Sequence, residues 1–112
     1  ATHGYALGGE TLNTPTASST DGALYKWAFA STGNSTDIGN LTLGRIEATG
    51  ISSHDNGYTG GGYRGGSNTF SLFASFEKHS FASDSNSTTV GSGIGGGAGK
   101  RAAAGQQDSA VT

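Results

Sequence analysis

The chain repeats itself, and this self-similarity constrains its fold more than any other feature. Residues 4–9, Gly-Tyr-Ala-Leu-Gly-Gly, recur 53 positions later as residues 57–62, Gly-Tyr-Thr-Gly-Gly-Gly. Residues 26–39 recur 52 positions later as residues 78–91, with eight of the fourteen residues identical. Two matches in the same order indicate an internal duplication.

A third block completes the pattern. Residues 44–50 align with residues 99–105 at a displacement of 55, and the extra residues fall in the glycine run 95–97. We therefore interpret the chain as a single repeat module with two units, approximately residues 1–52 and 53–112.

Glycine content decides between helix and strand. The 112 residues include 21 glycines and one proline, and glycine inside a helix costs about 1 kcal/mol relative to alanine. No stretch keeps apolar residues at helical spacing over three turns. The sequence therefore predicts an all-β fold.

Each unit has the length of a propeller blade. We expect four antiparallel strands, opening at residues 45–52 and continuing through 56–62, 70–82 and a short outer strand at 88–94. The period of about 53 is close to the ~50 residues of a kelch blade. The prediction is two kelch-like four-stranded blades, one of them split across the termini.

The two ends are halves of one blade. The chain begins at the first Gly-Tyr strand, and residues 106–112 occupy the repeat position of residues 51–56. Two blades cannot close a ring, and open strand edges invite association. We expect ring closure either by self-association of three or four copies or by further blades of a longer propeller.

The repeated motifs also carry a resemblance. They read Arg-x-x-Ala-Gly, His-Gly-Tyr-x-x-Gly-Gly and Lys-x-x-Phe-Ala-Ser-x-x-Asn-x-Thr-x-Val/Ile-Gly, over residues 3–42 and 54–105. The chain resembles kelch-like repeat proteins encoded by tailed bacteriophages, especially marine ones. The resemblance implies a virion or extracellular location, as in a tail fibre, and contact with host-surface molecules or other virion components. His79 stands where the first unit has Trp27, which puts the equivalence of the two units' sites in doubt.

The sequence does not predict binding to nucleic acid, insertion into a membrane, or a bound metal or cofactor. The formal net charge of -2 and the scattered basic residues give no basic stripe for nucleic acid. No apolar run approaches the roughly 20 residues of a membrane span, so membrane insertion is not expected. The chain has no cysteine. Asp37, Asp84 and Asp108 lack the clustered spacing of a calcium loop, and the sequence predicts no metal site and no cofactor.

No catalytic residue is predicted. Ser53, His54 and Asp55 are adjacent in sequence, and neighbours on a strand point to opposite faces, so they cannot converge as a triad. A propeller glycosidase is the less favoured alternative, because Glu10, Glu47 and Glu77 show no repeated placement. We expect a protein that is not an enzyme.

Tyr25, Trp27 and Tyr63 are the candidate ligand-binding residues, because an apolar ring face with polar neighbours suits the stacking of a sugar. The alternative interpretation of each is packing between blades. The sequence thus favours a non-enzymatic recognition or assembly module for glycans or proteins of a cell surface. A purely structural repeat unit without a ligand is the alternative.

Overall fold

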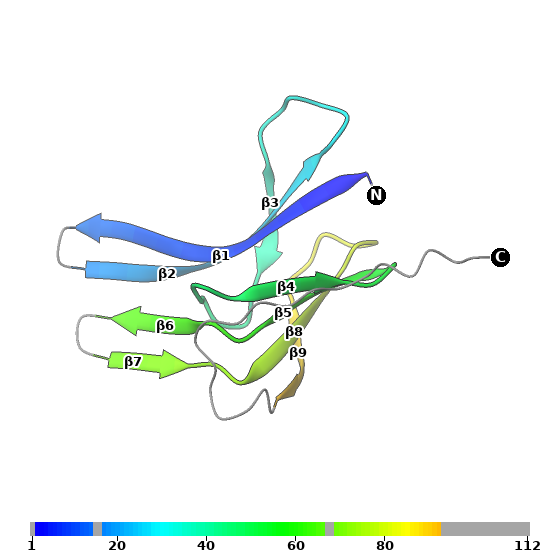
Figure 1. Cartoon of the computed structure of the whole chain (residues 1–112). Coiled ribbons are helices and arrows are strands. Elements are labelled where there is room, and N and C mark those ends of the chain that lie inside the picture. Colours follow the sequence, from blue (N-terminus) through cyan, green and yellow to red (C-terminus); the bar gives the residue numbers. More distant parts are fainter. Residues whose placement is uncertain (1, 15–16, 67–68, 93–112) are drawn as a thin grey trace.

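The computed structural model describes residues 2–14, 17–66 and 69–92, and these residues form strands and connections without a helix (Figure 1). No segment among them is therefore a helix that could cross a membrane. The predicted all-β class is confirmed for the described chain. Its strands are arranged in three antiparallel sheets.

The first repeat is one three-stranded sheet. It consists of β1 (His3–Thr14), β2 (Ala17–Ala28) and β3 (Thr36–Asn40), in the order β1-β2-β3. The two long strands form a hairpin, and β3 returns along the other side of β2. Among the described residues, β1 is paired on one side only.

The second repeat contains a four-stranded sheet and a hairpin. The strands of this repeat are β4 (Thr49–Ser52), β5 (Asn56–Gly60), β6 (Tyr63–Gly66), β7 (Thr69–Leu72), β8 (Ser75–Ser80) and β9 (Thr88–Ser92). The sheet has the order β4-β5-β8-β9, and β6 pairs with β7. The four strands of the sheet, β4, β5, β8 and β9, lie in the four regions where the sequence predicts strands.

One predicted strand is divided. Residues 70–82 were expected to form a single strand, but β7 and β8 belong to different sheets. Gly61 and Gly62 have positive φ angles of 66° and 84°, which glycine adopts without the Cβ clash of other residues. β5 ends just before these two glycines, and the chain turns there into β6. The break between β7 and β8 lies beside the same glycines, where Phe73 N–H donates to the Gly62 carbonyl.

The two repeats share their pairing register. Gly4 is the partner of Trp27 in the first sheet, and Gly57 is the partner of His79 in the second. Register shifts also recur, between Leu24 and Tyr25 of β2 and between Phe76 and Glu77 of β8, 52 positions apart. The sequence duplication is therefore a structural duplication.

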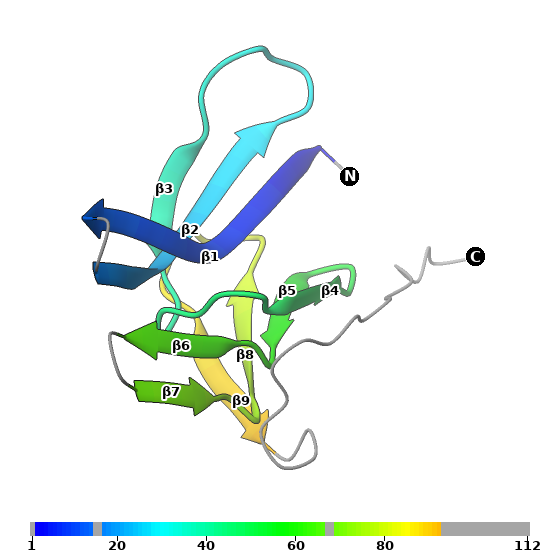
Figure 2. The same ribbon diagram turned by 60° about the vertical axis from the view of Figure 1, so that its left-hand side comes forward.

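Figure 2 shows the first sheet lying beside the strands of the second repeat. The core lies on the face of the first sheet that meets this repeat. Leu24, Ile38 and Leu41 form its buried cluster, and Tyr5 and Leu7 pack against them. Tyr5 also stacks on Phe81 of the second repeat. The core is thus shared between repeats, which explains how two thin sheets bury apolar surface that neither could bury alone.

The expected completion of the first sheet lies outside the described residues. The sequence places residues 106–112 at the repeat position of residues 51–56, as part of the blade split across the termini, and the structure describes the chain as far as Ser92. By contrast, β4, the last segment of the predicted first unit, pairs with β5 of the second repeat. This pairing agrees with a four-stranded unit that opens at β4.

Candidate functional site

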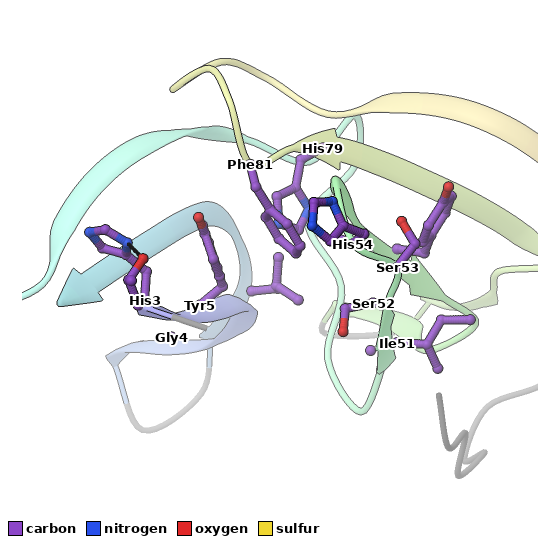
Figure 3. A pocket seen from close by; sticks show the side chains of 14 residues that line it. His3, Gly4, Tyr5, Ile51, Ser52, Ser53, His54, His79 and Phe81 are labelled. Atoms are coloured by element: carbon purple, nitrogen blue, oxygen red, sulfur yellow. Dashed lines mark hydrogen bonds between the residues drawn. The ribbon is translucent and has the colours of Figure 1, made fainter. Parts of the chain in front are cut away.

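A cleft of about 510 Å³ opens between the repeats (Figure 3). One wall is the beginning of β1, and the other comes from β4, β5 and the end of β8. Four successive residues, 2–5, line it. Because successive strand residues point to opposite faces, this lining places along the cleft the backbone edge of β1 that has no strand partner in the described part of the chain.

Three rings form an aromatic cluster in the cleft. Tyr5 stacks on Phe81, with ring centroids 4.8 Å apart and planes inclined by 25°. His79 lies against both of them, 5.4 Å from the Tyr5 centroid and 5.6 Å from that of Phe81. Such a cluster offers apolar ring surface beside polar ring atoms, as in Figure 3.

His79 is the unusual member of this cluster. Its side chain covers Gly57, where an added Cβ would lie 2.2 Å from the imidazole. The residue is 4% exposed, and among the described residues neither ring nitrogen has a hydrogen-bond partner. Burial lowers the pKa of His79 below its ordinary value, because removal from water disfavours the charged ring. The neutral imidazole is therefore the favoured form.

Ser53, His54 and Asp55 form a polar turn at the mouth of the cleft. The exposed His54 Nδ1 lies 2.6 Å from Asp55 Oδ1. The Ser53 hydroxyl is engaged elsewhere, since it accepts from Asn56 N–H and donates to the Asn56 carbonyl. The Ser53 hydroxyl is thus tied to the turn backbone and not to His54, as expected from their adjacency.

Glu77 is buried beside the cleft. Its carboxylate pairs with Arg45 and accepts from the Ser87 hydroxyl, and the Thr42 amide and hydroxyl donate to it at 2.7 Å each. Burial by itself raises the pKa of Glu77, but these hydrogen bonds and the Arg45 charge outweigh it and hold the pKa below its ordinary value. The carboxylate is therefore ionised and fully engaged in joining the repeats.

Arg45 completes this buried network. Its Nη1 donates to the carbonyl of Gly61 at 3.1 Å, and its guanidinium lies 4.8 Å from the centre of the Phe73 ring. Gly61 and Phe73 flank the break between the second sheet and the hairpin. The Arg45–Glu77 ion pair thus connects the loop after β3 to the region of the second repeat where the chain passes between the four-stranded sheet and the β6–β7 hairpin.

The predicted ligand-binding residues lie away from the cleft lining. Tyr25 and Trp27 are two positions apart on β2 and share one face of it, whereas Tyr63 begins β6, where its backbone pairs with Ile46. The structure therefore brings two of the three together on one face, and their role in ligand binding stays a prediction. Sequence reasoning did not select Tyr5, His79 and Phe81 as a site, although Tyr5 lies in the repeated Gly-Tyr block.

The acidic residues considered for calcium have other roles. Asp37 accepts from the amide of Gly39, and Asp84 pairs with Lys26 at 2.9 Å; Asp108 lies outside the described residues. Within residues 2–14, 17–66 and 69–92, no group of three or more His, Asp or Glu side chains is placed to hold a metal ion. A scan against protein-family models found no match, and a search of curated proteins found none either.

Proposed function

We propose that this chain is a non-enzymatic recognition and assembly module whose two repeats are consecutive blades of a kelch-like propeller. The observation that carries this proposal is the unequal pairing of two equivalent strands. In the second repeat, β5 has β4 on one side and β8 on the other, whereas β1 of the first repeat has only β2 as a strand partner within residues 2–14, 17–66 and 69–92. Among these described residues the first repeat has no counterpart of β4.

The missing strand has a candidate in the sequence. Residues 99–105 repeat residues 44–50, which lead into β4, so the segment that follows them is the natural counterpart of β4. Supplied by a neighbouring copy, this segment would cover β1 along the cleft, and a ring of three or four chains would leave no edge open. The resemblance to bacteriophage kelch-like proteins favours a virion or extracellular setting for such a ring.

Native mass spectrometry and light scattering on the purified chain test the proposal. We expect a discrete trimer or tetramer that persists on dilution into the micromolar range. A folded monomer at every concentration would contradict assembly by this chain alone. Circular dichroism distinguishes that outcome from an unfolded chain, which would instead support membership of a longer covalent propeller.

A second candidate function is recognition of a cell-surface glycan in the cleft. The observation that favours it is the aromatic cluster of Tyr5, His79 and Phe81, where stacked ring faces accompany ring nitrogens that have no hydrogen-bond partner among the residues the structure describes. Glycan-array binding that is lost in Tyr5→Ala would support it. Because an added strand would occupy the same edge of β1, sugar binding by the open chain and ring closure should compete.

A further inference from the structure

The far side of the second repeat carries the repeat equivalents of the core. The core residues Tyr5, Leu24 and Ile38 correspond, at displacements of 53 and 52, to the far-face residues Tyr58, Phe76 and Val90. Leu24 is 1% and Ile38 8% exposed, whereas Val90 is 48% exposed and Tyr58 and Phe76 are half-buried. Within the described residues, the second repeat thus has core-type residues that do not form a buried cluster of their own.

Strand alternation places these residues on the face that points away from the first repeat. Glu77 and His79 contact the first repeat through Thr42 and Tyr5, so the alternate residues of β8, Phe76 and Lys78, point to the opposite face. Tyr58 lies directly across from Lys78 and shares that face.

The first repeat has the complementary surface. Trp27 and Phe29 occupy the repeat positions of His79 and Phe81, the two residues that receive Tyr5. The indole of Trp27 covers Gly4 just as the imidazole of His79 covers Gly57. Trp27 is 37% and Phe29 59% exposed. Two large rings therefore form an exposed patch at a position where the second repeat makes an interface.

We propose that a second copy of the chain packs across these faces, with Tyr58 of one copy against Trp27 and Phe29 of the next. The contact reproduces the internal packing of Tyr5 on His79 and Phe81. The inference rests on the proposed assembly function and specifies the residues of its joint. The two surfaces differ, so the joint is head-to-tail and each copy uses one surface for each neighbour.

The packing between the two repeats of one chain, the internal joint, includes polar contacts. The proposed joint between copies repeats only some of them. Asn40 N–H donates to Asn86 Oδ1 within the chain, and the repeat equivalents, Ser92 and the exposed Asn34, would form the same bond between copies. By contrast, Tyr25 stands at the position of Glu77. The joint between copies therefore depends on its rings and lacks the buried ion pair.

The single tryptophan of the chain reports on this joint directly. We expect the emission maximum of Trp27 to shift to shorter wavelength as concentration rises, in parallel with the mass measured by light scattering. Tyr58→Ser should weaken association at least about tenfold, as expected for a central aromatic contact. Leu43→Ser is the control, because Leu43 is 45% exposed and belongs to neither face.

Mixing two variants tests the pairing of the faces. Trp27→Ser and Tyr58→Ser each damage one face and retain the other, so each alone should be weakened while the mixture forms a heterodimer. In that mixture the tryptophan signal comes only from the Tyr58→Ser copy and should shift. Circular dichroism of each variant verifies that it is folded. If Trp27→Ser is not folded, Phe29→Ser replaces it as the variant that damages this face.

Two contrary results are distinguishable. Association of the wild-type chain with constant Trp27 emission and no effect of Tyr58→Ser would overturn this joint, but would leave the assembly function standing. A wild-type chain that is folded and monomeric at every concentration, with constant emission, would overturn both proposals.

Discussion

The carboxylate of Glu77 and the guanidinium of Arg45 form an ion pair whose two side chains are completely buried between the repeats. Their remaining hydrogen-bonding groups are largely satisfied by Thr42, Ser87 and Gly61. Removal of one partner of such a pair leaves the other charged and desolvated, which costs far more than the pair contributes.

We expect Glu77→Gln to lower the free energy of unfolding by roughly 3 kcal/mol or more. Urea denaturation followed by circular dichroism measures this change. Asp84→Asn is the matched control, because Asp84 also pairs with a cation between the repeats but is exposed; its cost should be below about 1 kcal/mol. Equal effects of the two substitutions would contradict the assigned role of the buried pair.

Stability should fall in two stages as the pH is lowered. Burial holds the pKa of His79 below the ordinary 6.5, so the unfolded chain takes up this proton first and stability decreases below about that pH. The hydrogen bonds and Arg45 hold the pKa of Glu77 below the ordinary 4.5, so its contribution is complete above pH 4.5 and is lost as the pH falls through the folded value. The midpoint of urea unfolding, measured from pH 7.5 down to about 2, follows both stages.

His79→Trp separates the two stages. The substitution copies the arrangement of Trp27 over Gly4 and removes the titrating ring, so the loss of stability between pH 7 and 5.5 should shrink while the acidic stage remains. An unchanged upper stage in His79→Trp would show that another group titrates there.

Gly57→Ala should destabilise the second sheet. The new Cβ would lie 2.2 Å from the His79 ring, and forcing the ring aside costs about 1–3 kcal/mol. Gly91→Ala is the control, because nothing lies within 4 Å of its Cβ position. The double variant Gly57→Ala with His79→Ala should show an interaction energy that relieves part of the cost; additive effects would place the strain elsewhere.

Leu24 and Phe76 occupy equivalent positions with unequal burial. Leu24→Ala should cost about 2–5 kcal/mol, because it empties part of the core. Phe76→Ala should cost only about 1–2 kcal/mol in the dilute monomer, since the ring is half-buried. Thermal or urea unfolding at low concentration measures both. A larger effect of Phe76→Ala than of Leu24→Ala would contradict the placement of the core.

The sequence was sufficient to predict most strands of the second sheet, but not the β6–β7 hairpin or the site. Glycine pairs and aromatic blocks recur at a constant spacing, so the predicted regions at 45–52, 56–62 and 88–94 each contain a strand of the observed sheet. The region at 70–82 was misjudged because the break depends on the backbone of Gly61 and Gly62 pairing with a distant segment.

Burial of the polar residues could not be predicted in the same way. Glu77 was considered only as a carboxylate without a repeated equivalent, because its partners Thr42 and Arg45 lie more than thirty residues earlier and converge only when the repeats pack. His79 was noted as a departure from Trp27, and its position over Gly57 in the cleft depends on cross-strand register. Tyr25, Trp27 and Tyr63 were selected as rings with an apolar face and polar neighbours, a criterion that does not identify which rings face one another.

In the proposed assembly, the restriction of Glu77 to one of the two repeats would give the two kinds of joint different lifetimes. The joint inside a chain contains a buried ion pair, while Tyr25 at the equivalent position would leave a joint between chains without one. Dilution or shear at neutral pH would then separate whole chains before it separates the repeats within them. The chain would be the unit of exchange, released and replaced intact, and the position of a single acidic residue would set where the ring opens.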